Sequence, residues 1–379
     1  MTPRQEVLAA QDSEPPTDPK TDTSAFADLG LDETAIFDRD AVLQAFSASL
    51  GDKSDAPAIR RAAVATLKDA QAAGRGKISR AFEQAPLASR ALVRAYAHLT
   101  DCIVETVFHI STTFLHKNPN PTEGERMCIL AVGGYGRGEM SPYSDVDLLF
   151  LMPWKVTPWA ESLIESMLYI FWDLHMKVGH ASRSVKDCMR LGKEDYTIRT
   201  ALLEHRYLVG NEALAEQLDL KLKQELFRSS ASEFIEAKLA ERAERHRKQG
   251  GARYMVEPNV KEGKGGLRDL QTLFWIGKYI HGVNNVADLV GLGLFDLEEY
   301  ERFEAAETFL MAVRSHLHLA ADRAMDQLTF DMQVEIASRL GYDDRGGRRA
   351  VEHFMQDYFR HATVVGELTR IFLTALEAQ

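Results

Sequence analysis

Between positions 133 and 147 the chain reads Gly133-Gly-Tyr-Gly-Arg-Gly-Glu-Met-Ser-Pro-Tyr-Ser-Asp-Val-Asp147. This glycine-rich turn lies between two apolar runs, 127–132 and 146–151, whose composition predicts buried strands. Side chains alternate between the faces of a strand, so Asp145 and Asp147 are expected to point to the same side. Two carboxylates on one face can share a hard cation such as Mg²⁺, and glycines let backbone N–H groups approach phosphate oxygens. The stretch therefore predicts a site for a metal ion and a phosphate.

The order of these elements excludes one common nucleotide-binding loop and points to another family. The Gly-x-x-x-x-Gly-Lys-Ser/Thr spacing of a P-loop is missing from the turn. A strand, a Gly-Gly turn, the sequence Ser-Asp-Val-Asp and a second strand instead resemble the nucleotidyltransferase superfamily that includes DNA polymerase β. That resemblance implies backbone contacts from Gly133 and Gly134 to a nucleoside triphosphate and a hydroxyl contact from Ser144. It also assigns the metal ions to Asp145 and Asp147.

Composition limits the classes of function that the chain can have. Its 379 residues suffice for two or three domains. A formal net charge of −11 argues against general nucleic-acid binding, which needs concentrated Lys and Arg. Cys102, Cys128 and Cys188 show no Cys-x-x-Cys spacing and are expected to be reduced thiols of a cytoplasmic protein. We find neither a signal peptide nor an apolar stretch of about 18 residues, so we expect no secretion and no membrane span.

The pattern along the chain predicts an α+β fold, in which a small mixed sheet with helices is followed by an all-α bundle. Residues 1–40, rich in Pro, Asp, Thr and Ser, are predicted to form a mobile tail. We assign residues 41–229 to a nucleotidyltransferase domain with N-terminal helices, and residues 230–379 to a helical domain. Hydrophobic spacing in the first domain predicts helices over 56–115, 158–176 and 186–203, and further strands over 177–185 and 204–209.

A second informative segment reads Glu257-Pro-Asn-Val-Lys-Glu-Gly-Lys-Gly-Gly-Leu-Arg-Asp-Leu-Gln-Thr-Leu-Phe-Trp275. Its loop places Lys261 and Lys264 among three glycines, and the pattern predicts a helix that begins near Leu267. A helix N-terminus that follows such a loop favours an anion. Composition alone favours a flexible linker between helices that carries a solvated run of charges.

Several long motifs, in this order along the chain, are similar to the family of uridylyltransferase/uridylyl-removing enzymes that modify the PII nitrogen-signalling protein. The likeness covers about residues 90–379, through the segments 133–151, 178–180, 202–206, 257–275, 314–319, 323–330 and 351–361. It implies an enzyme that uses UTP and Mg²⁺, or Mn²⁺, to attach UMP to a tyrosine of PII in nitrogen regulation. The full family enzyme also contains an HD hydrolase domain and two ACT domains. This sequence has no His-Asp dipeptide, so we expect those domains, uridylyl-removing activity and a glutamine response to be absent.

The resemblance and the chemistry of the residues together give the remaining site predictions. Glu204, at the start of a predicted strand, is the first candidate for a third catalytic carboxylate, and Asp187 is the second. Arg137 either pairs with a phosphate or holds the turn by a salt bridge. Lys261 and Arg268 are expected to contact phosphate or nucleotide from the helical domain, which would close a cleft over the sheet.

Three histidines are interpreted mainly as packing residues. His180 lies on a predicted strand of a small sheet, where a structural role is the commoner one. His316 and His318 stand two residues apart on a predicted helix, so they do not face one another and make a poor metal pair.

Two other functions stay open on the sequence. An adenylyltransferase that acts on a different protein would carry the same motifs, because the choice of base depends on the shape of a pocket. A non-catalytic module that binds nucleotide or docks a PII-like partner would keep the fold. Such a module has no need of the adjacent carboxylates Asp145 and Asp147.

Overall fold

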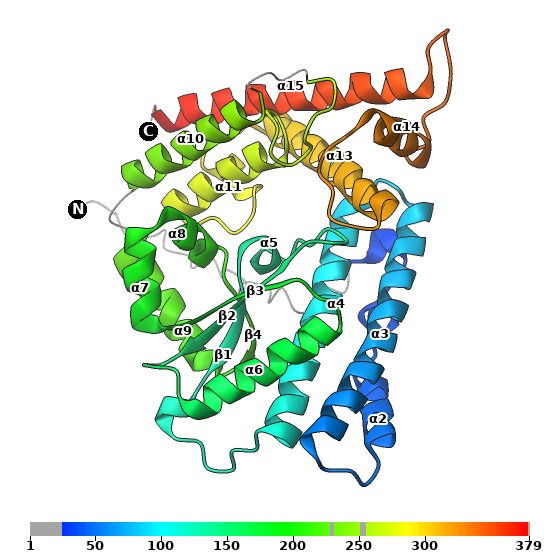
Figure 1. Ribbon diagram of the computed structural model, residues 1–379. Coiled ribbons are helices and arrows are strands. Elements are labelled where there is room, and N and C mark those ends of the chain that lie inside the picture. The colour runs from blue at the N-terminus through cyan, green and yellow to red at the C-terminus, as the bar shows by residue number, and fades with distance from the viewer. Residues whose placement is uncertain (1–24, 228–230, 251–254, 378–379) are drawn as a thin grey trace, which may run out of the picture.

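The computed structural model describes residues 25–227, 231–250 and 255–377 (Figure 1). We refer to residues 25–227 as the sheet half and to residues 231–377 as the helical half. The α+β architecture predicted from the sequence is confirmed, with a four-stranded sheet in the sheet half and helices throughout the other.

The sheet is small and mixed. Its strands lie in the order β3-β2-β1-β4, where β2 pairs with β1 in antiparallel and with β3 in parallel orientation. β4 pairs with the other edge of β1 in antiparallel orientation. The strand bounds are β1 Cys128–Ala131, β2 Val146–Met152, β3 Val178–Ser184 and β4 Arg206–Gly210. The strand that follows the paired aspartates is therefore an inner strand.

The alternation of side chains along β1 and β2 gives the sheet two apolar faces. On one face, Ile129 and Phe150 pack with residues of α3, α4 and α6. On the other face, Leu130 and Leu149 pack with residues of α7 and α9. Strands covered on both sides read as continuous apolar runs, which is why these two were recognisable in the sequence. The bounds of the covering helices are α3 Ala56–Gln84, α4 Ser89–Ile110, α6 Pro158–Asp173, α7 Val185–Glu194 and α9 Glu212–Lys221.

The predicted N-terminal tail is corrected in part. Residues 1–24 lie outside the described residues, but residues 25–40 are folded. They form η1 (Ala27–Leu29), α1 (Glu33–Ile36) and the start of α2 (Arg39–Leu50), and these elements pack against α3 and α4. The apolar side chains that drive this packing are buried: Phe26, Leu29, Ile36 and Phe37.

Two boundaries near the sheet also differ from the prediction. The helix expected over 186–203 is two helices, α7 and α8 (Tyr196–Leu203), because Asp195 accepts backbone N–H groups of the second helix and caps it. Glu204 is the C-terminal cap of α8 and lies before β4, so its expected place at the start of a strand is wrong.

The helical half packs around a core of aromatic and branched side chains, among them Phe303, Leu310, Phe354 and Phe372. Its long helices α10, α11, α13 and α15 lie together above the sheet half in Figure 1. Within the described ranges, no helix of either half is long and apolar enough to cross a membrane. The bounds are α10 Ala231–Lys248, α11 Leu267–His281, α12 Asp288–Gly291, α13 Leu297–Ala321, α14 Phe330–Arg339 and α15 Ala350–Glu377.

The two halves meet where α4 crosses α13. Val93 of α4 belongs to the core of the helical half, and Ala312 of α13 belongs to the core of the sheet half. Ser89 donates a hydrogen bond to the carbonyl oxygen of Thr308 at 2.8 Å. This contact fixes the helical half beside the glycine-rich turn.

Candidate active site

The glycine-rich turn is a single helical turn, α5 (Gly133–Gly136), directly after β1. Gly133 has a φ of +62°, a left-handed conformation that glycine adopts without strain. A Cβ atom at this position would lie 3.6 Å from Oδ2 of Asp147. The preceding Val132 donates its backbone N–H to the carbonyl oxygen of Asp147 at 3.1 Å. The turn and the second aspartate are therefore direct neighbours.

Asp145 directly precedes the inner strand β2, and Asp147 is its second residue. Both are exposed, while Val146 between them is buried, as the alternation predicted. Asp147 lies beside Gly179 of β3 in the parallel register. A Cβ atom at Gly179 would come within 2.5 Å of Oδ1 of Asp147, so the neighbouring strand leaves room for this carboxylate only because it has glycine there.

The electrostatics of the two aspartates favour a cation between them. Partial loss of solvation and the nearby charge of Asp145 raise the pKa of Asp147, and Lys261 opposes that shift. Like charges close together disfavour ionisation, and a bound cation relieves this cost. Lys261 comes from the helical half, so the structure brings this predicted residue within electrostatic reach of the carboxylates. Burial lowers the pKa of Lys261, and the neighbouring cations Arg314 and Arg268 lower it further.

The two carboxylates suit a metal ion that also keeps water molecules and substrate phosphates as ligands. Among the described residues, no group of three or more His, Cys, Asp or Glu side chains could hold a metal ion. Mg²⁺ is commonly bound by one or two carboxylates together with water and substrate phosphates. Asp145 and Asp147 beside the glycine turn fit that chemistry, whereas a cage made of protein ligands alone would need more donors.

Glu204 and Arg137 form an ion pair that supports the glycine-rich turn. Arg137 donates to Oε1 of Glu204 at 2.6 Å and to Oε2 of Glu139 at 3.0 Å. Glu204 is 2% exposed, and a Cβ atom at Gly136 would overlap its backbone carbonyl at 1.8 Å. The salt-bridge alternative for Arg137 is thus the one observed. Glu204 supports the turn and is not grouped with the two aspartates.

Three other predicted residues have local roles in the structure. The Ser144 hydroxyl accepts the backbone N–H of Ser141 at 3.1 Å and so closes the turn before Asp145. Asp187 accepts the Ser184 hydroxyl at 2.7 Å in the capping box of α7. His180 is an exposed residue of β3, with its ring centroid 6.4 Å from that of Phe150.

The loop that carries Lys261 is compact and ordered, unlike a flexible linker. Asn259 accepts the backbone N–H groups of Lys261 and Glu262 at 3.1 and 2.7 Å. Gly265 has a φ of +82°, and a Cβ atom there would lie 2.4 Å from the carbonyl oxygen of Ala362 in α15. The predicted helix start near Leu267 is confirmed, because α11 begins at that residue.

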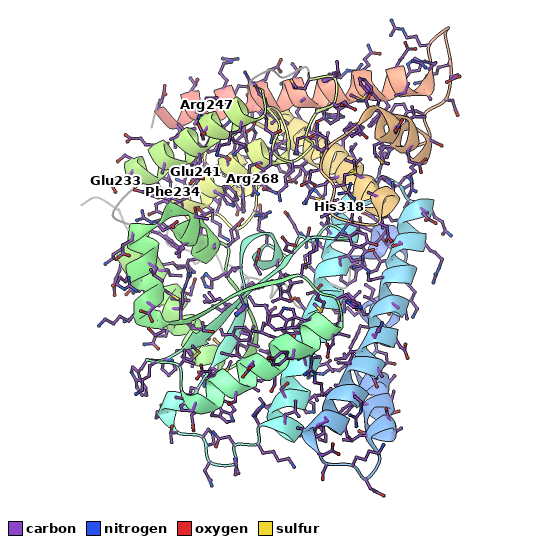
Figure 2. All side chains as sticks on the ribbon, viewed as in Figure 1. Glu233, Phe234, Glu241, Arg247, Arg268 and His318 are labelled. Carbon is purple, nitrogen blue, oxygen red and sulfur yellow. The ribbon has the colours of Figure 1, made fainter. Side chains whose placement is uncertain are left out.

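Arg268 is already engaged within the helical half. Its guanidinium donates to Glu262 at 3.2 Å and to Gln271 at 2.9 Å. It also lies over the ring of Trp275, 5.3 Å from the centroid. Figure 2 labels Arg268 at the start of α11. A contact to a nucleotide would have to compete with these partners, so Arg268 is a weaker candidate than Lys261.

Sequence reasoning missed a cluster of residues on α13 and the segment that follows it. Arg314 donates to the Ser141 hydroxyl at 2.9 Å, and His318 accepts the backbone N–H of Tyr143 at 3.2 Å. Both side chains also contact Asp326. A signal was available, since Arg314, His318 and Asp326 fall in motifs that had been recognised only as part of a helical domain. His316 is buried and stacks on Phe82, in agreement with its predicted packing role.

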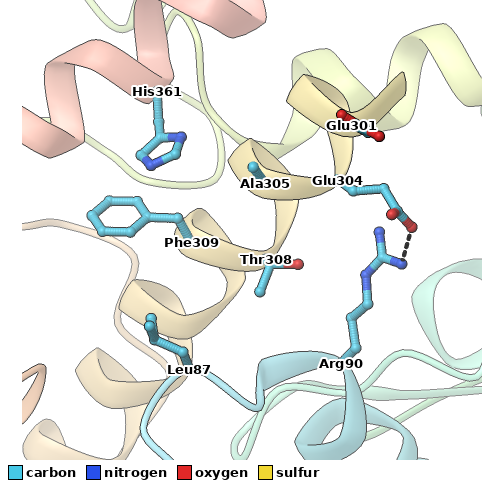
Figure 3. Close-up of a pocket in the computed structure, with 8 residues that line it drawn as sticks. All are labelled: Leu87, Arg90, Glu301, Glu304, Ala305, Thr308, Phe309 and His361. Atoms are coloured by element: carbon cyan, nitrogen blue, oxygen red, sulfur yellow. Dashed lines mark hydrogen bonds and ion pairs between the residues drawn. The ribbon is translucent and has the colours of Figure 1, made fainter. Parts of the chain in front are cut away.

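A separate open pocket of about 540 Å³ lies between α4, α13 and α15 (Figure 3). It contains none of the predicted site residues. Its walls include the Arg90–Glu304 ion pair and the stacked rings of Phe309 and His361. The chemistry-bearing residues lie instead at the glycine turn, so we place the candidate active site there.

Comparison with known proteins finds matches along most of the chain. A family model described as nucleotidyltransferase domain matches residues 124–208, and one described as GlnD PII-uridylyltransferase matches residues 233–373. Three curated proteins named bifunctional uridylyltransferase/uridylyl-removing enzyme are similar to the chain. The protein of Ruegeria pomeroyi is 61% identical over 90% of this chain, that of Cereibacter sphaeroides 56% over 98%, and that of Azospirillum brasilense 47% over 91%. The matches span 38%, 40% and 37% of those relatives, so the chain covers about two fifths of their length.

Proposed function

Because this chain is a relative of the bifunctional uridylyltransferase/uridylyl-removing enzymes and matches their transferase portion, we propose that it transfers UMP from UTP to a tyrosine of a PII signalling protein. The observation that carries the proposal is the exposed pair Asp145 and Asp147 on an inner strand, beside the Gly133 turn and opposite Lys261. In this proposal they would hold a metal ion and a triphosphate at the start of β2.

Asp145 and Asp147 are the residues that would hold Mg²⁺ in this proposal. When bound, Mg²⁺ neutralises phosphate charge and lowers the pKa of a coordinated hydroxyl. Their exposure supports this role, because within the described ranges no ion pair with a basic side chain occupies either carboxylate. Loss of solvation and then the nearby charge of Asp145 raise the pKa of Asp147, and a bound cation would relieve the repulsion between the two carboxylates.

The other residues of the site would orient the triphosphate. Backbone N–H groups of Gly133 and Gly134 approach the phosphates, and the Lys261 ammonium adds a positive charge from the helical half. The tyrosine oxygen attacks the α-phosphorus in line and forms a new P–O bond, while the bond to the departing pyrophosphate breaks. The proton of the tyrosine hydroxyl is lost to solvent or to a carboxylate. Arg137, paired with Glu139 and Glu204, keeps the turn in shape during this step.

The first prediction tests this function directly. Labelled UTP, Mg²⁺ and purified PII are incubated with the native chain, with the Asp145→Asn/Asp147→Asn double variant, and with Asp187→Asn as a matched control. We expect the native chain and the control to label PII, and we expect the double variant to lose about a hundred- to a thousandfold in rate, the scale found when one group that stabilises the transition state is removed.

A parallel reaction with labelled ATP separates the alternatives. Labelling with ATP in preference to UTP would replace the proposal by adenylyl transfer. Tight UTP binding with no labelling of PII would favour a nucleotide-binding module, and equal activity of the double variant would remove the paired aspartates from the site.

A further inference from the structure

The loop between the glycine turn and Asp145 is held in place by the helical half. The backbone N–H of Tyr143 donates to Nδ1 of His318 at 3.2 Å, and Arg314 donates to the Ser141 hydroxyl at 2.9 Å. Tyr143 also donates its hydroxyl to Asp322. Since Asp145 follows this loop directly, the position of the loop backbone sets the position from which the carboxylate projects. Figure 2 labels His318 near the end of α13.

The contacts of His318 fix which ring nitrogen carries the proton. Its side chain is fully buried. Because Nδ1 accepts the N–H of Tyr143, it must be unprotonated, and Nε2 then carries the proton and donates to Asp326 at 3.2 Å. Burial lowers the pKa of His318, which agrees with a neutral ring. Asp326 therefore orients His318 in the same way that an outer carboxylate orients a functional histidine.

Asp326 also fixes the opposite side of the site. Its carbonyl oxygen accepts the backbone N–H of Val260 at 2.8 Å, directly before Lys261. Its carboxylate binds Arg314 at 2.7 Å as well as His318. One residue thus joins the loop that leads to Asp145 to the loop that carries Lys261.

We propose that His318, oriented by Asp326, is a positioning residue that holds the Tyr143 backbone and so aligns Asp145 and Asp147 for metal and nucleotide binding. The inference rests on the proposed function, because it assumes that these carboxylates bind the metal ion. It predicts that the Nδ1 acceptor is the essential atom of the ring, and that the fit of the ring in the core is secondary.

Two substitutions separate these atoms. In His318→Asn, the side-chain oxygen takes the place of Nδ1 and can still accept the Tyr143 N–H. In His318→Gln, the amide reaches the place of Nε2 and the Nδ1 acceptor is lost. His316→Asn, two residues earlier on the same buried helix, is the matched control for general damage to packing.

The first measurement is the affinity for Mn²⁺ in the presence of UTP, determined by electron paramagnetic resonance. The second is the rate of amide hydrogen exchange in the segment 140–145. The second readout needs no ligand. We expect His318→Gln to weaken Mn²⁺ binding by about tenfold or more, the effect typical of lost outer-shell support, and to speed exchange of the Tyr143 amide. We expect the Mn²⁺ affinity of His318→Asn to stay within about threefold of that of the native chain. His316→Asn should bind Mn²⁺ as the native chain does.

The possible results decide between the claims. Native Mn²⁺ affinity and native exchange in His318→Gln would overturn the positioning role while leaving the proposed function intact. Equal losses of Mn²⁺ affinity in His318→Gln, His318→Asn and His316→Asn would also overturn the positioning role, because such losses would reflect packing alone. Absence of Mn²⁺ binding in the native chain with UTP would overturn the proposed function and this inference with it.

Discussion

Lys261 brings a positive charge of the helical half within electrostatic reach of Asp147. Its charge opposes the rise in the pKa of Asp147, although burial and the neighbouring Arg314 and Arg268 lower the pKa of Lys261 itself. A half-buried cation that faces carboxylates and basic groups together is well placed to receive a phosphate, which carries the compensating negative charge. Arg268, with partners in its own half, is less suited to this role.

Replacement of Lys261 by Met should therefore weaken nucleotide binding without unfolding the chain. A charged hydrogen bond to a phosphate contributes about 1.5 to 3 kcal/mol, so we expect the Kd for UTP to rise by about ten- to a hundredfold. Isothermal titration measures the Kd, and thermal melting checks the fold. Lys264→Met, in the same loop, is the control and should bind UTP like the native chain. Equal Kd values for Lys261→Met and the native chain would exclude Lys261 from the nucleotide site.

At the scale of elements, the start of α11 is anchored by one buried carboxylate. Asp269 is fully buried and accepts hydrogen bonds from Arg242, Arg245 and His246 of α10. It also accepts the backbone N–H of Gly265 at 2.9 Å. This one side chain therefore joins α10 to α11 and closes the glycine loop that follows Lys261.

The charge of Asp269 should make stability depend on pH. Burial alone would raise its pKa, but the hydrogen bond from His246 and the charges of Arg242 and His246 outweigh burial and lower the pKa to about 2. A lowered carboxyl pKa stabilises the fold above the unfolded value of about 4, and the contribution is lost as pH falls toward 2. We expect Asp269→Asn to cost about 3 kcal/mol at pH 7, because it leaves the partly buried basic groups of α10 without their partner.

Urea unfolding between pH 3 and pH 7 measures this effect. The difference between the native chain and Asp269→Asn should narrow as pH falls below about 4. Asp331→Asn, an exposed substitution in α14, should show no such difference at any pH. A gap that stays constant with pH would indicate that lost packing, and not lost charge, explains the destabilisation.

Elements with strong patterns could be predicted from the sequence, and those set by tertiary contacts could not. The apolar runs of β1 and β2 and the start of α11 at Leu267 follow from local composition. The break between α7 and α8 depends on the capping choice of Asp195. The folding of residues 25–40 depends on partners in α3 and α4, far along the chain, that a local pattern does not reveal.

The candidate site shows the same division. The pairing of Asp145 with Asp147 follows from the two-residue period of a strand. The role of Glu204 could not be predicted in this way, because an acidic residue near a predicted strand can bind a metal ion or pair with an arginine. Only the fold brings Arg137 to it. The contacts of His318 and Asp326 were hidden for a similar reason, since they join residues 175 and 8 positions apart.

At the scale of the whole molecule, the two halves share their cores across α4 and α13. Val93 is 2% exposed and packs in the helical half, while Ala312 packs in the sheet half. The Arg90 ion pairs to Glu304 and Glu307 lie beside the same contact. We therefore expect the halves to unfold together.

Val93→Ala should destabilise the entire chain by about 2 kcal/mol, the scale of a truncation in a packed core. Native-state hydrogen exchange measures the free energy of opening at each amide. We expect this free energy to fall by the same amount for amides of α6 and of α15. Val156→Ala, at an exposed position, should leave both unchanged. Faster exchange confined to α15 would show that the halves unfold independently.

Val93 and Ala312 each pack in the core of the opposite half, and this arrangement bears on how such a chain is inherited. Each core includes one apolar side chain that the other half supplies. A genetic rearrangement that joined this sheet half to an unrelated helical bundle would remove Ala312 from one core and leave Val93 without its packing partners. The two halves are thus expected to be inherited as a unit, with the sheet and its helical bundle passing together from ancestor to descendant.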